Sequence, residues 1–472
     1  MSVTKSRLDP TTIQTLAKSL RGDLVDPQHQ DYDAARRLYN AMIDKRPALI
    51  ARCLDVADVI TCVRFAAAEG VDLAIRGGGH NGGGLGSVDD GLVIDLSHLR
   101  GVRVNPEART ATVAGGTTLG EVDHATHAFG LAVPAGIIST TGVGGLTLGG
   151  GLGYLTRKYG LSIDNLIEAD VVLADGSLAR ASESENDDLF WAIRGGGGNF
   201  GVVTSFTFQT RPVSTVIGGP MLWPLEQAPE VLDFYTELLA QGPDELGGFF
   251  AVLTVPPGPP FPEELHLKKV CGVVWCYAGT EADAKAALAP IRAKFPPILD
   301  GVGELPLPAL QAAFDGLYPP GDQWYWRADF VGEIPAKAVE AHLTYAKAFP
   351  TWKSSMHLYP IDGAAGRVAA DATAWTYRDA RFAQVIVGVD PDPAMAGTIR
   401  DWTVGYWEAL HPYSLGGAYT NFMMDEGSDR VRASYGSNYE RLSRIKARYD
   451  PTNLFHVNQN IQPASRQDHT AR

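Results

Sequence analysis

The stretch over residues 75–86, IRGGGHNGGGLG, holds the residue types best suited to chemistry. Gly77, Gly78 and Gly79 carry no Cβ, so the backbone can turn with positive φ and press closely against a ligand. Successive N–H groups in such a turn bind anions, and Arg76 adds a positive charge. His80 is nucleophilic and titrates near neutral pH. This pattern predicts a phosphate cradle for a nucleotide cofactor whose reactive end passes His80.

Two more glycine clusters follow, over residues 142–153 and 194–201. In the first of them the glycines recur too densely for a core helix, which predicts close approach of the backbone to a ligand. None of the three clusters has the strand-to-helix context and the distant acidic residue of a Rossmann fingerprint. We therefore expect loops, and not a helix dipole alone, to hold the nucleotide.

The overall composition limits the classes of protein to which this chain can belong. The 472 residues are 45% hydrophobic, which predicts a globular chain of two or three domains. A formal net charge of −14 argues against nucleic acid or an anionic membrane as a partner. No apolar run is long enough to cross a bilayer, and no signal peptide follows Met1. The spacing of the four cysteines fits neither a zinc site nor a disulfide framework. We expect a cytoplasmic protein without a metal.

The elements that position these clusters follow from hydrophobic periodicity. Up to residue 211, helices are predicted over 10–20, 55–69 and 119–129, and strands over 46–53, 71–75, 92–96, 110–114 and 202–207. Further on, helices over 226–239, 281–295, 336–349 and 392–410 alternate with apolar runs over 248–255, 270–277, 354–359 and 382–389. That alternation favours an antiparallel sheet backed by helices, an α+β arrangement. A last helix over 439–449 precedes an amide-rich segment over 452–461.

Four segments together resemble the FAD-linked oxidases of the vanillyl-alcohol oxidase superfamily. They are residues 76–81, 142–165, 194–201 and 449–459, and the resemblance is strongest to the berberine-bridge-enzyme-like branch, which includes hydroxynicotine and oligosaccharide oxidases. The resemblance implies a two-domain α+β flavoprotein. Its PCMH-type FAD-binding domain would comprise residues 1–211, completed by a C-terminal segment over 430–472, and residues 212–429 would form the substrate-binding domain.

The resemblance also implies how FAD is bound. In the family, the histidine that matches His80 bonds to the C8 methyl carbon of the flavin, and many members add a second link from a cysteine. Ile138 stands at the cysteine position, so we expect a single covalent bond, through His80. The expected cofactor-binding residues are Arg76, Gly77, Gly78, Gly79, His80, Asn81, Gly86, Thr141, Gly142, Gly144, Gly145, Leu146, Gly149, Gly150, Tyr159, Asp164, Asn165, Gly198, Asn199, Val202, Phe455, Asn458 and Asn460.

The catalytic base has more than one candidate. Tyr419 matches a family active-site position, whereas Phe422 replaces the tyrosine that serves as base in several relatives. His357 and Tyr359 alternate on one face of a predicted strand. His357 is either the base itself or a partner that stabilises the Tyr419 phenolate, a role that the positive environment beside flavin N5 could also fill. Tyr377 is expected in the pocket wall, with a direct part in the chemistry as the alternative. The aromatic run Trp324, Tyr325, Trp326 suits either a flat apolar substrate or an ordinary buried strand.

We expect an FAD-dependent oxidase that takes a hydride from a CH–OH or CH–N carbon of a small organic molecule and is reoxidised by O₂. Thr141 stands where the family often carries Val or Leu, which leaves open a dehydrogenase that uses another acceptor. A flavin-scaffold protein without net redox turnover, such as a cyclase or isomerase, is the alternative from another class. Either a monomer or a homodimer is compatible with the sequence.

Overall fold

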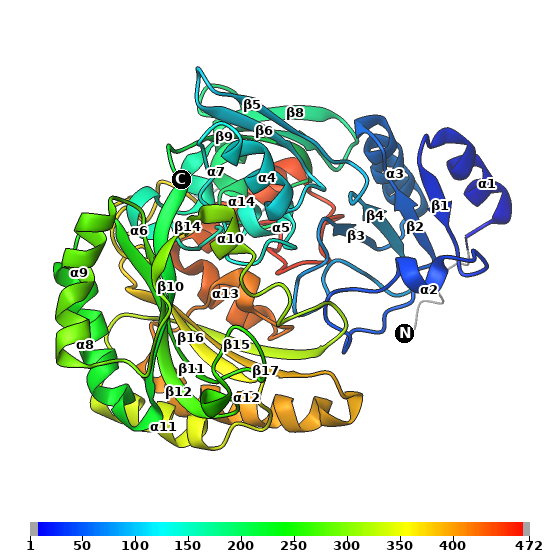
Figure 1. Cartoon of the computed structure of the whole chain (residues 1–472). Helices are drawn as coiled ribbons and strands as arrows, with labels where there is room; N and C mark the ends of the chain where they lie inside the picture. The colour runs from blue at the N-terminus through cyan, green and yellow to red at the C-terminus, as the bar shows by residue number, and fades with distance from the viewer. Residues whose placement is uncertain (1–7, 466–472) are drawn as a thin grey trace.

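Residues 8–465 are described by the computed structural model, and they form three β-sheets flanked by helices (Figure 1). The smallest sheet has the order β1-β2-β4-β3. Its strands are β1 (Asp23–Val25), β2 (Leu49–Arg52), β3 (Leu73–Arg76) and β4 (Leu92–Asp95). Both β2 and β3 run parallel to β4, and the connection between β2 and β3 passes through α3 (Val56–Glu69). The strand β3 ends at Arg76 and so delivers the chain directly into the first glycine cluster.

The capping signals of α3 agree with its sequence. The Asp55 side chain accepts a hydrogen bond from the N–H of Asp58, and Gly70 ends the helix with φ +64°. Val59, Cys62, Val63 and Ala66 are buried, as the predicted apolar stripe requires. Helix α1 (Pro10–Ser19) packs against α3, and α2 (Tyr32–Ala35) lies before β2.

A second, five-stranded antiparallel sheet has the order β5-β6-β9-β7-β8. Two long strands, β7 (Leu166–Val172) and β9 (Val202–Gln209), form its centre. They are flanked by β5 (Val102–Asn105), β6 (Thr110–Ala114) and β8 (Leu178–Ser182). Phe206 and Phe208 point from β9 into the largest apolar core. Helices α4 (Leu119–His127), α7 (Asp187–Ile193) and α14 (Tyr439–Tyr449) lie around this sheet, and α14 brings the C-terminal part of the chain against α7 (Figure 1).

The third sheet is antiparallel and has eight strands, in the order β13-β10-β12-β11-β16-β17-β15 with β14 paired to β10. Its outer face carries α8 (Ala228–Gln241), α9 (Glu281–Lys294), α11 (Ala336–Lys347) and α12 (Ala396–Leu410) (Figure 1). The predicted antiparallel sheet backed by helices is thus confirmed. The strands are β10 (Thr215–Pro224), β11 (Leu246–Thr254), β12 (Lys269–Tyr277), β13 (Leu299–Asp300), β14 (Gly303–Pro306), β15 (Gln323–Val331), β16 (Ser355–Pro360) and β17 (Phe382–Asp390).

One prediction about the second glycine cluster is wrong. Residues 142–153 are not loop throughout, because α5 (Val143–Leu148) forms inside the cluster. The N–H of Leu146 bonds to the Gly142 carbonyl, and the N–H of Gly149 bonds to the Gly145 carbonyl. A Cβ on Gly144 would lie 3.1 Å from the Gly115 carbonyl oxygen, so glycine lets this short helix press against neighbouring backbone. The density of glycine reflects tight packing here as well as an open loop.

The short helices α6 (Thr156–Tyr159), α10 (Leu307–Gln311) and α13 (Ser428–Tyr435) and several 3₁₀ turns, among them the one over Thr420–Phe422, complete the described chain. No helix within residues 8–465 is both long enough and apolar enough to cross a bilayer.

A fully buried ion pair ties the C-terminal segment to the second sheet. The Lys446 ammonium on α14 donates to the Asp450 carboxylate at 2.7 Å, to the Asn199 carbonyl at 2.6 Å and to the Phe455 carbonyl at 2.9 Å. Asp450 in turn accepts the backbone N–H groups of Leu454 and Phe455. Both charged side chains have no exposed surface. This network joins the third glycine cluster to the residues after α14.

We expect Asp450→Asn to lower the free energy of unfolding by about 3–5 kcal/mol, because it leaves a buried ammonium without its countercharge. Urea denaturation followed by circular dichroism measures the change. Arg432→Gln is the matched control: it breaks an ion pair with Glu440 whose side chains are more than half exposed, so its effect should stay below about 1 kcal/mol. Equal losses in the two variants would contradict the structural role of the buried pair.

Candidate functional site

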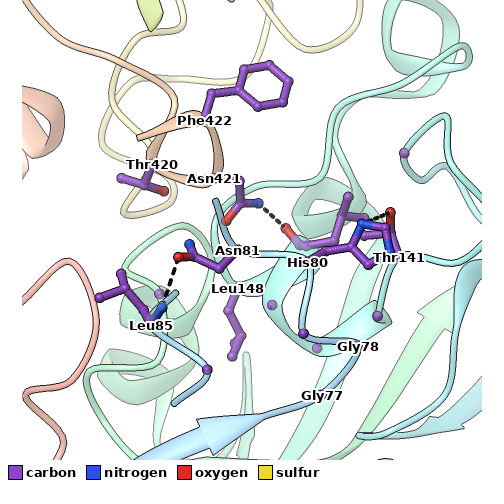
Figure 2. Close-up of a pocket in the computed structure, with 18 of the residues that line it drawn as sticks. Gly77, Gly78, His80, Asn81, Leu85, Thr141, Leu148, Thr420, Asn421 and Phe422 are labelled. Carbon is purple, nitrogen blue, oxygen red and sulfur yellow. Dashed lines mark hydrogen bonds between the residues drawn. The ribbon is translucent and has the colours of Figure 1, made fainter. Parts of the chain in front are cut away.

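The three sheets meet around one large cavity with a volume of about 350 Å³, within the range of ligand sites. At one end it is lined by the backbone of residues 77–81, by residues 141–146 and by Gly197 and Gly198. At the other end it is lined by side chains from β11, β15, β16 and β17. The cavity therefore lies where loops of the two smaller sheets face the inner surface of the large sheet. Figure 2 shows part of its wall.

The glycine-rich end depends on a contact between two backbones. A Cβ placed on Gly78 would lie 2.7 Å from the Cα of Gly142 and closer still to its nitrogen, and a Cβ on Gly142 would meet Gly78 in the same way. Real side chains do not tolerate such distances, so glycine is required at both positions. The loop after β3 and the start of α5 lie back to back as a result.

The same end offers backbone donors that no protein group uses. The N–H groups of Gly78, Gly79, His80 and Asn81 donate to no other residue within 8–465. In the first turn of α5 the Val143 N–H bonds to the Thr117 carbonyl, whereas the N–H groups of Gly144 and Gly145 donate to no residue within 8–465. Unpaired backbone donors seek an acceptor, and phosphate oxygens are suitable acceptors for a concave set of N–H groups. The arrangement is consistent with the predicted phosphate cradle.

Arg76 differs from its predicted role as a free positive charge. Its guanidinium is buried and donates to Asp95 at 2.6 Å, across the register of β3 and β4. Burial opposes ionisation of Asp95, yet the neighbouring Arg76 charge and hydrogen bonds hold the pKa of that carboxyl below its usual value. The pair is close to neutral as a unit, so Arg76 lends the cradle less charge than the sequence indicates. Its Nη1 still has no hydrogen-bond partner in the described chain.

His80 lies on the cavity wall between two threonines and a tyrosine. Its Nε2 is 2.9 Å from the Thr140 hydroxyl. Its Nδ1 is 3.5 Å from the Thr141 hydroxyl, and Figure 2 shows these two side chains together. The Tyr39 ring stacks on the imidazole with centroids 4.0 Å apart and an angle of 21°. Burial lowers the pKa of His80 to about 4, so the imidazole is neutral and nucleophilic at neutral pH.

Tyr419 lines the cavity just before the 3₁₀ turn over Thr420–Phe422. Its hydroxyl oxygen accepts two hydrogen bonds, from the N–H of Gly151 at 2.9 Å and from the Asn421 side-chain amide at 2.8 Å. Burial raises the pKa of Tyr419 to about 12, and both donors oppose that rise because they stabilise the phenolate. The same Asn421 amide also donates to the Leu146 carbonyl on α5 at 3.0 Å.

His357 and Tyr359 both line the cavity, as their alternation on β16 predicts, but they bond to each other and not to Tyr419. The distance from His357 Nδ1 to the Tyr359 hydroxyl is 2.9 Å. Burial raises the pKa of Tyr359 far above its usual value, so the phenol keeps its proton and donates it to Nδ1. Burial also lowers the pKa of His357 to about 4. The neutral ring then carries its proton on Nε2, which makes it a donor. The expectation that His357 stabilises a Tyr419 phenolate is wrong, since Gly151 and Asn421 do so.

Most of the expected cofactor-binding residues share one location, the wall of this cavity. They are Arg76, Gly77, Gly78, Gly79, His80, Asn81, Gly86, Thr141, Gly142, Gly144, Gly145, Leu146, Gly198, Phe455 and Asn458. The Oδ1 atom of Asn458 is buried without a partner, because the Asn458 amide group already donates to Gly198 and Phe455. A ligand N–H is the partner that this acceptor lacks.

The other expected cofactor residues do not line the cavity, and most have structural partners. Asp164 pairs with Arg378, with two N–O distances of 2.8 Å. Tyr159 lies under the Arg211 guanidinium, and that guanidinium donates to Asn165. The Asn199 side chain bonds to Gly196, Gln459 and Ile461. Val202 is buried in an apolar core, and Asn460 lies outside the wall.

Gly149 and Gly150 also lie outside the wall. Because they have no side chains, the side chains of Tyr419 and Asn421 can approach their backbone closely. A Cβ on Gly149 would collide with the Asn421 side chain, and one on Gly150 would lie 3.2 Å from the Tyr419 ring. Tyr377 is not in the pocket wall either. It stacks on Phe330 with centroids 4.5 Å apart and donates to the Ala433 carbonyl, so its role is packing.

Several lining residues escaped the sequence analysis. Tyr39 lies in an irregular segment before β2, where no periodicity marks it, and its neighbour Asn40 supports the site from outside the wall. The buried Asn40 side chain donates to the carbonyls of Gly82 and Trp324 and accepts the N–H of Trp324, so it joins the first glycine cluster to β15. Asn421 lies next to the predicted Tyr419, but nothing in a single sequence identifies it as the partner of that phenol.

Comparisons with known proteins agree with this geometry. Residues 47–182 match the family model described as an FAD binding domain, and residues 418–462 match the one described as berberine and berberine like. An FAD-linked oxidoreductase of Dictyostelium discoideum is 30% identical over 456 residues, which cover 96% of this chain and 97% of that protein.

Solved structures of two oxidases superpose on this chain over nearly its whole length. The 6-hydroxy-D-nicotine oxidase of Arthrobacter nicotinovorans superposes with a TM-score of 0.85 at 26% identity, over 94% of this chain and 99% of that one. A xylooligosaccharide oxidase of Myceliophthora thermophila, in complex with xylobiose, superposes with a TM-score of 0.83 at 26% identity, over 96% of this chain and all of that one.

We expect Gly78→Ala to yield protein largely free of bound flavin, because the added methyl group forces the first glycine loop away from Gly142. The ratio of flavin absorbance to protein absorbance after purification measures occupancy. Gly397→Ala on α12 is the matched control, since a Cβ there meets nothing within 4 Å. Wild-type occupancy in Gly78→Ala would show that the contact between the two loops does not form the cradle.

Proposed function

The chain belongs to the berberine-bridge-enzyme-like family of FAD-linked oxidoreductases, and we propose that it binds FAD covalently through His80 alone and oxidises a CH–OH or CH–N carbon beside Tyr419. One observation carries this proposal: a single cavity runs from unpaired backbone donors, past a neutral histidine, to a tyrosine whose oxygen accepts two hydrogen bonds. Residues 1–211 and 430–472 would hold the cofactor, with residues 212–429 on the substrate side.

The structure fits FAD in three respects. The Gly78–Gly142 contact leaves no room for side chains, so a pyrophosphate can reach the unpaired N–H groups. Asn458 Oδ1 and Arg76 Nη1 are a buried acceptor and a buried donor without partners. The cavity continues past His80 between aromatic and aliphatic side chains, as a flat ring system requires. Residues 77–81 and 142–145 would hold the phosphates.

His80 is suited to a covalent bond because its imidazole is neutral and its orientation is fixed. Tyr39 stacking and the two threonine hydroxyls restrict rotation of the ring. Attachment would join an imidazole nitrogen of His80 to the C8 methyl carbon of the flavin, with one proton lost from each partner and the two released electrons passed to O₂. Ile138 lines the cavity and cannot form a thioether, which supports a single link.

When bound, FAD supplies a two-electron acceptor for the hydride that leaves the substrate carbon. The protein must orient the substrate and take the proton from its hydroxyl or amine. Tyr419 is the proposed base, because the Gly151 N–H and the Asn421 amide stabilise negative charge on its oxygen. His357 is the weaker candidate, since its Nδ1 is already hydrogen-bonded to the Tyr359 hydroxyl.

O₂ is the proposed final acceptor. The chain belongs to the same family as proteins named as oxidases, and it shares their fold over nearly its whole length. Thr141 lies in the cavity wall with its hydroxyl next to His80. Threonine matches valine in size and is smaller than leucine, so Thr141 fills no more space beside the histidine than the residues that the family often carries.

We expect His80→Ala to release its flavin when the protein is denatured with acid, whereas the wild-type protein stays yellow after precipitation. Removal of the imidazole removes the nucleophile but leaves the glycine cradle intact, so the variant should still bind FAD without a covalent bond. Mass spectrometry of proteolytic fragments provides a second measurement. A flavin-bearing peptide that lacks His80, or one that contains a cysteine, would contradict the single link.

We expect Tyr419→Phe to slow anaerobic flavin reduction by substrate by two decades or more, on the order of 10²–10⁴-fold for loss of a general base. The pH dependence identifies the base. A phenol with a pKa of about 12 is mostly protonated at neutral pH, so the wild-type rate should rise about tenfold per pH unit between pH 6 and 9. Tyr419→Phe should lose that slope. A rate that is flat above about pH 5 would instead point to His357, whose pKa is about 4.

A further inference from the structure

We propose that the substrate is a neutral, flat ring compound that carries few hydroxyl groups, and that Trp326 is a main determinant of this specificity. The inference rests on the proposed function, because it concerns the substrate end of the same cavity. Three independent properties of the wall support it: the charge of its side chains, the use of its polar groups and its aromatic surface.

The near absence of charged side chains from the cavity wall excludes ionic substrates. Arg76 is the sole permanently charged side chain among the described residues of the wall, and no lysine, aspartate or glutamate joins it. Arg76 lies at the cradle end and is paired with Asp95. His80 and His357 are neutral because burial lowers the pKa of each ring to about 4. A carboxylate or ammonium at the substrate end would lose its water without gaining a countercharge.

The polar groups of the wall are mostly engaged with one another. The Tyr39 hydroxyl donates to the Tyr318 carbonyl, and the Tyr318 hydroxyl donates to the Lys353 carbonyl. Tyr359 is bonded to His357. The Asn421 amide group is shared between Tyr419 and Leu146.

Few polar atoms therefore remain for a ligand. They are the Tyr419 hydroxyl, His357 Nε2, and the buried Thr420 hydroxyl and indole N–H groups of Trp324 and Trp326, which have no partner in the described chain. A sugar ring brings several hydroxyls, each of which costs free energy when it is buried without a partner. The wall instead suits a compound with one oxidisable hydroxyl or amine near Tyr419 and one acceptor near His357.

The remaining surface is aromatic and comes from adjacent strands. Trp324 and Trp326 point inward from β15, while Tyr325 lies outside the wall, as strand alternation requires. Val387 of β17 pairs with Trp326 on one side and with Ser355 of β16 on the other, so these three side chains form one row across the sheet. Trp326 lies edge-on to both Trp324 and Phe422. Phe249 and Phe314 extend the aromatic surface beside His357. Stacking against such rings favours a planar ligand.

Ligand titration of the oxidised holoenzyme without O₂ tests the substrate class. The probes are 1-phenylethanol, mandelate and D-glucose; mandelate differs from 1-phenylethanol by a carboxylate in place of a methyl group. The change in flavin absorbance gives each Kd. We expect 1-phenylethanol to bind at least tenfold more tightly than either of the other two. Equal or tighter binding of mandelate or D-glucose would overturn the proposal, and so would the absence of any spectral change with 1-phenylethanol.

A separate measurement tests the proposed function. Oxidation of 1-phenylethanol to the ketone releases two electrons and two protons. The flavin would take up both electrons and one of the protons, and its absorbance would bleach. Binding selectivity without bleaching by any neutral aryl carbinol or arylmethyl amine would count against the oxidase proposal while it supported the substrate class. Failure of the substrate-class proposal and failure of the oxidase proposal therefore give different results.

Variants locate the specificity. Trp326→Ala should weaken 1-phenylethanol binding at least tenfold without loss of bound flavin, and Trp326→Phe should restore most of the affinity because it restores a ring. Trp352→Ala is the matched control, since its side chain is 36% exposed and lies outside the cavity wall. Unchanged affinity in Trp326→Ala, or an equal loss in the control, would overturn the assignment of Trp326.

Discussion

The close contact between Gly78 and Gly142 is the constraint on which the rest of the site depends. It joins the loop after β3 of the smallest sheet to the start of α5. The residues around Gly142 are in turn fixed to the segment before α4, because Leu119 N–H bonds to Thr141 and Val143 N–H bonds to Thr117. Backbone alone sets the separation of the two loops. No side-chain rotamer can adjust it, so the unpaired N–H groups keep a fixed spacing whether or not a ligand is present.

Tyr419, the proposed base, is anchored to the glycine-rich side of the cavity and not to the large sheet. Its oxygen is held by Gly151 and by Asn421, and Asn421 is itself held by Leu146 of α5. The inner face of the large sheet contributes the walls around the substrate. Chemistry and recognition are therefore assigned to different elements. Proteins with one fold but differently named activities, a nicotine derivative oxidase and a xylooligosaccharide oxidase among them, are compatible with this division.

Much of this arrangement could be predicted from the sequence because its signals are local. The apolar stripe and caps of α3, the run that forms β17 and the glycine loop after β3 each depend on residues a few positions apart. The cavity-lining roles of His80, His357 and Tyr359 followed from position and alternation. The resemblance to a known family supplied the identity of the cofactor, which periodicity alone could not provide.

The predictions that failed required knowledge of distant partners. From the sequence alone Arg76 is interpreted as a free charge, because only the pairing of β3 with β4 brings Asp95 beside it. Tyr377 and Asp164 occupy positions of functional interest, yet Phe330 and Arg378 engage them in packing and in an ion pair. Tyr39 was missed because it lies in irregular chain and meets His80 only through the tertiary fold. The helix α5 formed in spite of its glycines because tertiary contacts outweigh intrinsic propensity.

The buried Lys446–Asp450 network has a consequence for biosynthesis. Phe455 and Asn458 belong to the cavity wall, and the Lys446 ammonium fixes Phe455 against the carbonyl of Asn199. A ribosome-bound chain lacks this wall until residues 455–458 emerge, although the glycine loops are made long before. The cofactor therefore meets a complete site only after those residues have left the ribosome, and their emergence, rather than translation of the glycine-rich segments, sets the moment at which it can be retained.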